Sequence, residues 1–137
     1  MNILFVCKWN RFRSKATEAT FKHFNRNPEN QAQSAGLFPG VPVSDDIVKA
    51  GELLGLRIDR TQQGMPHSLL MWAGKIIIVA DDIPPEIFKE IKENDKKDII
   101  IWKIKDVVGT DIDSRKKVIG DISQKVKKLI LNLNNKK

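Results

Sequence analysis

One stretch near the N-terminus limits the possible folds more than any other part of the chain. Residues 3–6, Ile-Leu-Phe-Val, form a continuous apolar run that leads directly into Cys7, the only cysteine of the sequence. Such a run is typical of a parallel strand that is buried on both faces. Arg13 and Ser14 follow shortly afterwards, where a helical pattern begins. We therefore predict a buried strand over residues 2–6, a tight loop, and a helix that starts near Ser14.

The loop between this strand and this helix has the composition of an oxyanion site. A thiolate is a far stronger nucleophile than a thiol, and the pKa of a thiol falls at a helix N-terminus or beside a cation. The loop amides can form a concave anion nest, to which the helix adds its positive end. Arg13 can hold two phosphate oxygens in a bidentate fork. Ser14 can cap the helix and donate to the sulfur of Cys7, and Asn10 tolerates a left-handed backbone.

A simpler interpretation of the same residues stands beside this one. A lone cysteine after an apolar strand is commonly a small buried hydrophobe. A lone arginine at a helix start is commonly a solvated surface charge. The strand, loop and helix context favours the site for phosphate over this alternative, because a motif gains weight from its structural setting.

The rest of the chain alternates between helix-like and strand-like patterns. Helical spacing of apolar residues and short apolar runs distinguish the two. In the second predicted helix, we expect Ile47, Ala50 and Leu54 to face inward. The predicted helices cover residues 14–25, 44–54, 67–72, 84–93 and 111–132. The further predicted strands cover residues 31–35, 75–80 and 98–102. We expect the last of these strands to be buried.

Strands that alternate with helices imply an α/β fold. We predict a four-stranded parallel sheet, doubly wound with helices on both faces, in a single domain over residues 1–137. The first strand would lie centrally in this sheet. It would then carry Cys7 to the carboxyl edge, where open α/β sheets bind their ligands.

Composition excludes several other classes of protein. The net charge is +7, but the basic residues are spread along the chain without a recognition helix or zinc spacing, so we expect no nucleic-acid partner. One cysteine cannot form an internal disulfide, which suits the cytoplasm and excludes a cysteine-rich metal site. No apolar run approaches the roughly 20 residues of a membrane span. We expect a cytoplasmic protein without metal or cofactor, as a monomer or weak dimer.

A family resemblance adds to this interpretation. Cys7-x5-Arg13-Ser14 with Asn10 inside, preceded by Leu-Phe-Val and followed by Ala-Thr-Glu-Ala, resembles the low-molecular-weight protein tyrosine phosphatases, whose wider family includes arsenate reductases. The resemblance continues through Ser34-Ala-Gly to an aspartate in the C-terminal third. It implies a cysteine nucleophile, a phosphocysteine intermediate and no metal, and it implies that Ser34 braces the phosphate loop. On sequence alone, a serine that only starts a turn is an equal alternative for Ser34.

Two further positions are compared with the family. Similar proteins carry a histidine in the region of residues 57–66 that supports the phosphate loop, and here Thr61 and Gln62 stand nearest in register. His67 comes too late in the sequence and is given no role. The family commonly has glycine where this chain has Trp9, so the loop geometry differs or Trp9 forms an aromatic wall of the pocket.

The reaction also needs an acid that protonates the leaving oxygen. Asp106 follows the fourth predicted strand and should overhang the same edge as Cys7. The family normally has proline and often aromatic residues after this aspartate, and both are absent here. Asp111 is the runner-up, with capping of the last helix as its alternative role, and Asp82 at the end of the third strand is a weaker candidate.

We therefore interpret the chain as a cysteine-dependent phosphatase that acts on phosphotyrosine or another aryl phosphate, in a phosphorylated protein or a small molecule. Cys7, Arg13 and Asp106 are the expected catalytic residues, and Ser34 supports them. Core packing is the stronger expectation for the side chain of Phe12. An arsenate reductase that uses an external thiol and a non-catalytic phosphate-binding regulatory module remain as alternatives. The residues expected around the bound phosphate are Lys8, Trp9, Asn10, Arg11, Phe12 and Ser14.

Overall fold

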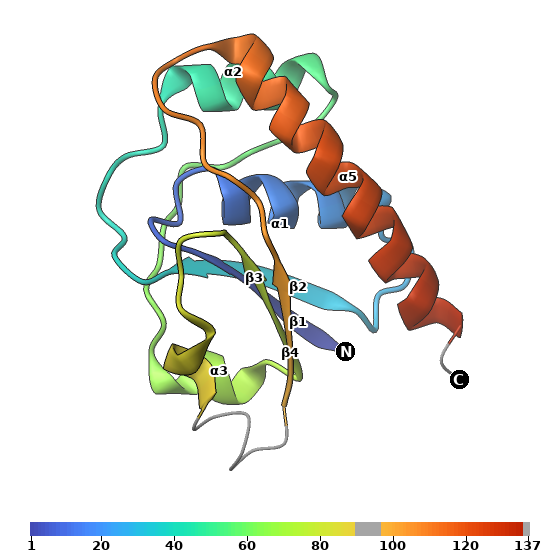
Figure 1. Ribbon diagram of the computed structural model, residues 1–137. Coiled ribbons are helices and arrows are strands. Elements are labelled where there is room, and N and C mark those ends of the chain that lie inside the picture. Colours follow the sequence, from blue (N-terminus) through green and yellow to red (C-terminus); the bar gives the residue numbers. More distant parts are fainter. Residues whose placement is uncertain (90–96, 136–137) are drawn as a thin grey trace.

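The computed structural model describes residues 1–89 and 97–135 and contains a four-stranded sheet (Figure 1). Every pair of neighbouring strands is parallel, and the order across the sheet is β2-β1-β3-β4. The predicted α/β fold with a central first strand is therefore confirmed. The strands are β1 (Asn2–Cys7), β2 (Gln31–Gly36), β3 (Lys75–Val79) and β4 (Asp98–Trp102).

Helices cover both faces of the sheet (Figure 1). On one face α1 and α5 pack on the sheet and α2 packs against α5, and on the other face lie α3 and the short 3-10 helix η1. The sheet is thus doubly wound, as predicted. The helical elements are α1 (Arg13–Phe24), α2 (Asp45–Leu53), α3 (His67–Trp72), η1 (Pro85–Phe88) and α5 (Ile112–Asn135).

The apolar run in β1 is explained by its position. Ile3 and Phe5 enter the core under α1 and α5, whereas Leu4 and Val6 enter the core under α3. All four side chains are fully buried. A strand between two helical layers has no solvent-facing side, so alternation of apolar and polar residues is lost. This arrangement brings Cys7 to the carboxyl edge of the sheet.

Three predictions about the elements differ from the structure. Leu54 does not face inward and is 41% exposed, because α2 ends at Leu53 and Gly55 turns the chain with a φ of 77°. The fourth strand is not buried, because β4 lies at the edge of the sheet and Ile101 is 39% exposed. The predicted helix over residues 84–93 begins as a 3-10 helix (Pro85–Phe88) and continues with a helical Lys89, and its remaining residues lie outside the described residues.

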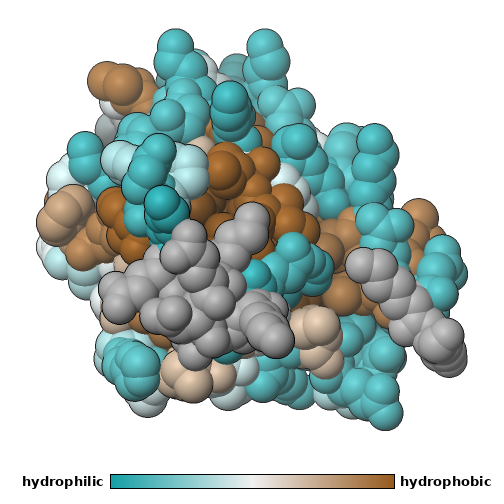
Figure 2. Space-filling model, turned by 60° about the horizontal axis from the view of Figure 1, so that its bottom comes forward, coloured by the Kyte–Doolittle hydropathy of each residue, from teal (hydrophilic) through white to brown (hydrophobic). Residues whose placement is uncertain are grey.

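Part of the apolar surface remains exposed. Phe38, Val108 and Leu131 are among the large apolar side chains that reach the surface. Figure 2 shows one face of the molecule, on which apolar side chains gather near the middle and hydrophilic side chains surround them. Within residues 1–89 and 97–135, no helix combines the length and the apolar character that a membrane crossing requires.

Candidate active site

The site begins where β1 passes into α1. Cys7 is the last residue of β1, and its Sγ lies 3.0 Å from Oγ of Ser14 in the first turn of α1. Both residues are buried. The expected role of Ser14 as helix cap is wrong, because α1 begins at Arg13 and the N-cap position is occupied by Phe12 without a side-chain hydrogen bond. The Ser14 hydroxyl faces the thiol instead.

Asn10 holds the middle of the loop together. Its φ is 50°, the left-handed conformation that the sequence suggested for this residue. Its Nδ2 donates to Oγ of Ser14 at 2.9 Å and to Oγ of Ser34 at 3.0 Å. Its Oδ1 accepts from the backbone N–H of Gln63 at 2.9 Å. The side chain of Asn10 therefore joins the loop to β2 and to the segment before α3.

Gly36 allows the loop to lie directly against the end of β2. A Cβ at this position would lie 2.5 Å from the backbone N of Asn10 and 2.7 Å from the carbonyl carbon of Trp9. Side chains essentially never approach backbone atoms so closely. Gly36, two positions after Ser34, is therefore required by the close approach of two backbones.

The segment before α3 supports the loop from outside. Nε2 of Gln62 donates to the carbonyl of Asn10 at 3.1 Å and to that of Val41 at 2.7 Å. Of the two residues in register with the family's histidine, Gln62 thus contacts the loop, whereas the backbone N–H of Thr61 donates to Asp59. The contact from the neighbouring Gln63 was not anticipated, since a glutamine in an irregular segment carries no periodic signal.

Arg13 lies at the other end of the loop and is only 1% exposed. Its Nη1 donates to the carbonyl of Ile104 at 3.0 Å, and its Nη2 lies 3.1 Å from Oδ1 of Asp82. Asp81 lies 3.5 Å from Nη1, and Asp106 lies 3.7 Å from Nη2. The carboxylates come from the loops after β3 and β4, which leave the parallel sheet at the same edge as Cys7.

The aspartates differ in where the structure places them. Asp106 and Asp82 both lie beside Arg13, as their positions after β4 and β3 suggested. Asp111 does not, because it accepts a hydrogen bond of 2.6 Å from Ser114 at the start of α5. This hydrogen bond holds the pKa of Asp111 below its usual value. Asp111 therefore takes the capping role that was its alternative.

The remaining loop residues have different environments. The ring of Trp9 lies 6.0 Å from that of Phe38, centroid to centroid, and Nζ of Lys8 lies 5.0 Å from the centroid of the Trp9 ring. Nε of Arg11 donates to the carbonyl of Pro42 at 2.9 Å. Phe12 is 2% exposed and packs in the core, so its side chain is unavailable to a ligand. Trp9 and Phe38 together form an aromatic surface beside the loop.

Arg115 of α5 is a buried residue that the sequence did not single out. Its side chain is fully buried, donates to Asp46 at 2.9 Å and to the carbonyl of Gly109 at 2.9 Å, and lies 4.5 Å from the centroid of the Phe12 ring. Burial raises the pKa of Asp46. The hydrogen bonds to its carboxylate and the charge of Arg115 lower this pKa by more than burial raises it, so the net shift is downward. Arg115 thus connects α2, the loop after β4 and the loop after β1.

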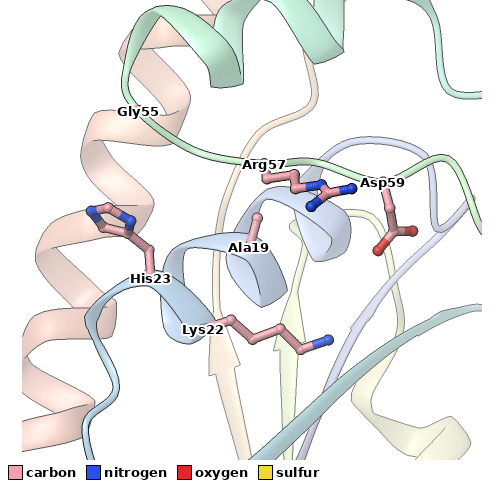
Figure 3. Close-up of a pocket in the computed structure, with 6 residues that line it drawn as sticks. All are labelled: Ala19, Lys22, His23, Gly55, Arg57 and Asp59. Atoms are coloured by element: carbon pink, nitrogen blue, oxygen red, sulfur yellow. The ribbon is translucent and has the colours of Figure 1, made fainter.

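A separate hollow of about 490 Å³ lies on the outer side of α1 (Figure 3). Two of its charged groups already have partners, since Lys22 binds Glu18 at 2.6 Å and Asp59 binds Lys15 at 2.6 Å. Cys7 and Arg13 do not line it, so the candidate site stays at the sheet edge. Within residues 1–89 and 97–135, no cluster of His, Cys, Asp and Glu suits a metal ion. The residues that line the hollow are Ala19, Lys22, His23, Gly55, Arg57 and Asp59.

Comparison with known proteins identifies relatives along the whole chain. Residues 2–137 match the model of a family described as low molecular weight phosphotyrosine protein phosphatase. No curated protein sequence matches the chain. A low molecular weight protein tyrosine phosphatase from T. tengcongensis is 25% identical, with a TM-score of 0.82 over 96% of this chain and 99% of that chain.

Two further solved structures share the fold at lower identity. The YwlE arginine phosphatase from Geobacillus stearothermophilus is 19% identical, with a TM-score of 0.83 over 97% of this chain and 92% of that chain. An arsenate reductase from Archaeoglobus fulgidus is 24% identical, with a TM-score of 0.75 over 93% of this chain and 98% of that chain. The family match extends over nearly every residue, including the loop from Cys7 to Ser14. The chain therefore belongs to the low molecular weight phosphotyrosine protein phosphatase family.

Proposed function

We propose that this protein hydrolyses phosphotyrosine or another aryl phosphate through a phosphocysteine intermediate, without a metal ion. The proposal is carried by one observation. Cys7 Sγ lies 3.0 Å from the Ser14 hydroxyl at the start of a loop that ends in the buried guanidinium of Arg13. A thiol is suited to attack a phosphoryl group when it lies beside a hydroxyl and at the same loop as an arginine that can bind two phosphate oxygens.

In the first step, the thiolate of Cys7 attacks phosphorus in line with the leaving oxygen. The S–P bond forms as the P–O bond breaks, and Asp106 gives its proton to the leaving oxygen. Arg13 and the amides of residues 8–13 hold the equatorial oxygens, over which the charge of the transition state spreads. Arg13 exchanges its carboxylate contacts for phosphate oxygens when the substrate binds.

In the second step, water attacks the phosphocysteine. Asp106, now a carboxylate, takes a proton from this water, and the S–P bond breaks. Inorganic phosphate leaves, the thiolate of Cys7 is restored, and Asp106 is again protonated. One aspartate can serve both steps because the loop after β4 places Asp106 at the phosphate loop, 3.7 Å from Nη2 of Arg13 before the substrate binds.

The test is steady-state hydrolysis of p-nitrophenyl phosphate across pH, with no metal added, for wild type, Cys7→Ser and Asp106→Asn. We expect turnover in wild type, none in Cys7→Ser, and a strong loss in Asp106→Asn. Full turnover in Cys7→Ser would overturn the mechanism. Turnover that depends on Cys7 but is indifferent to Asp106 would keep the nucleophile and transfer the acid role to Asp82, which also lies beside Arg13.

A second candidate substrate is phosphoarginine, and one observation favours it. The site already surrounds a guanidinium group, that of Arg13, with the carboxylates of Asp81, Asp82 and Asp106. Once Arg13 binds the phosphate group of the substrate, these carboxylates can hold the guanidinium of a phosphoarginine. The P–N bond of phosphoarginine would then break, instead of the P–O bond of an aryl phosphate. A solved structure with the same fold is named an arginine phosphatase. Faster hydrolysis of phosphoarginine than of phosphotyrosine peptides would select this candidate.

Absence of any hydrolysis in wild type would favour the two remaining interpretations. Arsenate reduction would require an external thiol, since Cys7 is the only cysteine. It would be measured as arsenite formed in the presence of a small dithiol. Phosphate binding without turnover of any of these substrates would instead indicate a regulatory phosphate-binding module.

A further inference from the structure

We propose that Glu18 is a positioning residue: it fixes the donor direction of the Ser34 hydroxyl and so helps to hold Asn10 in the orientation in which Ser14 donates its proton to the sulfur of Cys7. The proposal deepens the proposed function and rests on it, because that function requires Cys7 to react as a thiolate. Glu18 lies on α1 one turn beyond Ser14, and its side chain is 12% exposed. Its hydrogen-bonded path to the thiol runs through Ser34, Asn10 and Ser14.

The orientation of the Asn10 amide is determined by the main chain. The backbone N–H of Gln63 can only donate, and it lies 2.9 Å from the side-chain oxygen of Asn10. The other atom of the amide is therefore the nitrogen, whose two N–H groups meet Ser14 at 2.9 Å and Ser34 at 3.0 Å. Both hydroxyl oxygens thus accept from Asn10, and each hydroxyl keeps its own proton to donate.

Glu18 determines the acceptor to which the Ser34 hydroxyl donates its proton. Oε1 of Glu18 lies 2.5 Å from Oγ of Ser34, a short distance at the lower end of the range for a hydroxyl that donates to a carboxylate. An ionised carboxylate can only accept, so Ser34 donates outward and turns its lone pairs toward Asn10. With Asn10 held in this way, its Nδ2 donates a hydrogen bond to a lone pair of Oγ of Ser14. The proton of Ser14 is then directed at the sulfur of Cys7, 3.0 Å away.

Two lysines surround the side chain of Glu18. Lys22 lies 2.6 Å from its Oε2, and Lys15 lies 3.8 Å from its Oε1. Lys15 is also held by Asp59 at 2.6 Å, and both Lys22 and Asp59 are drawn in Figure 3. These residues come from α1 and from the segment after α2, while Arg13 and its carboxylates lie at the far end of the loop. Glu18 is thus held in place by ammonium groups on one side and by the Ser34 hydroxyl on the other.

Substitution of Glu18 by glutamine separates this role from simple electrostatics, because the two predict opposite signs. Loss of a negative charge near the site would by itself make the thiolate easier to form. The proposal predicts the reverse. The glutamine amide can donate to Ser34, which redirects the Ser34 proton inward, loosens Asn10 and weakens the hydrogen bond from Ser14 to the thiolate.

The experiment measures the rate of Cys7 alkylation by iodoacetamide as a function of pH in wild type, Glu18→Gln and Ser34→Ala. Glu52→Gln, on the exposed surface of α2, is the matched control. We expect the alkylation midpoint to rise by roughly half a pH unit in both network variants, and to stay unchanged in the control. A midpoint that is unchanged or lower in folded Glu18→Gln overturns the proposal.

Thermal unfolding of each variant shows whether it is folded. A purely structural role of Glu18 would lower the melting temperature without moving the alkylation midpoint. If Glu18→Gln does not fold, Ser34→Ala decides by the same criterion, since it breaks the network at the next link. Alkylation needs no turnover, so wild type that fails to hydrolyse p-nitrophenyl phosphate would overturn the proposed function alone.

Discussion

Arg13 donates a hydrogen bond of 3.2 Å to Asp82, although 69 positions separate the two residues. They meet because β1 and β3 are parallel neighbours, so the chain leaves both strands at the same edge of the sheet. A phosphate group bound in the loop would need the same guanidinium. Under the proposed mechanism, Asp82 and phosphate therefore compete for Arg13.

Replacement of Asp82 by asparagine should strengthen phosphate binding. The change removes a negative charge beside the site and frees one side of the guanidinium of Arg13. We expect the dissociation constant of inorganic phosphate to fall by roughly three- to tenfold, measured by calorimetric titration at neutral pH. Asp81→Asn should have a smaller effect, because Asp81 lies further from the guanidinium, at 3.5 Å. Weaker phosphate binding in Asp82→Asn would show that Asp82 orients Arg13 rather than competing for it.

The proposed role of Asp106 as the acid predicts a dependence on the leaving group. A poor leaving group needs protonation more than a good one does. Asp106→Asn should therefore lower kcat by about 10²- to 10³-fold with phenyl phosphate, and by clearly less with p-nitrophenyl phosphate. Asp111→Asn should leave both rates within about twofold, because Asp111 caps α5. Equal losses on the two substrates in Asp106→Asn would argue against proton donation by this residue.

Gly36 offers a direct test of the packing between β2 and the loop. Gly36→Ala should lower the free energy of unfolding by about 2 kcal/mol or more, since the new Cβ meets backbone atoms that cannot move independently. Hydrolysis should fall with it, because the displaced atoms belong to Asn10 and Trp9. The control is Gly120→Ala in α5, where a Cβ meets nothing within 4 Å. This change should stabilise the protein by about 0.5–1 kcal/mol in urea unfolding.

Acid should destabilise the protein through Asp46. The pKa of Asp46 is lowered from its usual value of 3.8, because Arg115 and the other hydrogen bonds to the carboxylate outweigh the opposing effect of burial. The stabilisation is thus complete above about pH 4 and is lost as the pH falls through the lower, folded-state pKa. Urea midpoints measured between pH 2 and pH 6 should show a steeper acid loss in wild type than in Asp46→Asn. Glu52→Gln, on the same helix, should follow wild type.

Local patterns in the sequence were sufficient to locate the loop and its neighbours. The apolar run before Cys7 predicts a strand, and the apolar spacing after Ser14 predicts a helix, because both signals depend on residues a few positions apart. The left-handed backbone of Asn10 is one that its residue type tolerates. β2 is different, since Gln-Ala-Gln-Ser-Ala has weak strand propensity, and it is held in place by pairing with β1 along its whole length.

Tertiary structure decided which side chains meet. Nothing in the sequence pairs Arg13 with Asp82, Ser34 with Glu18, or Arg115 with Asp46, because each contact depends on how distant elements pack and which rotamers that packing permits. The same reason explains why Asp111 caps a helix while Asp106 stays at the site. The end of β4 places Asp106 beside Arg13, and the path of the following loop places Asp111 at the start of α5, although both residues are aspartates. Local periodicity therefore determined the strand, the loop and the helix, and long-range packing determined the hydrogen-bond partners of the thiol and the guanidinium.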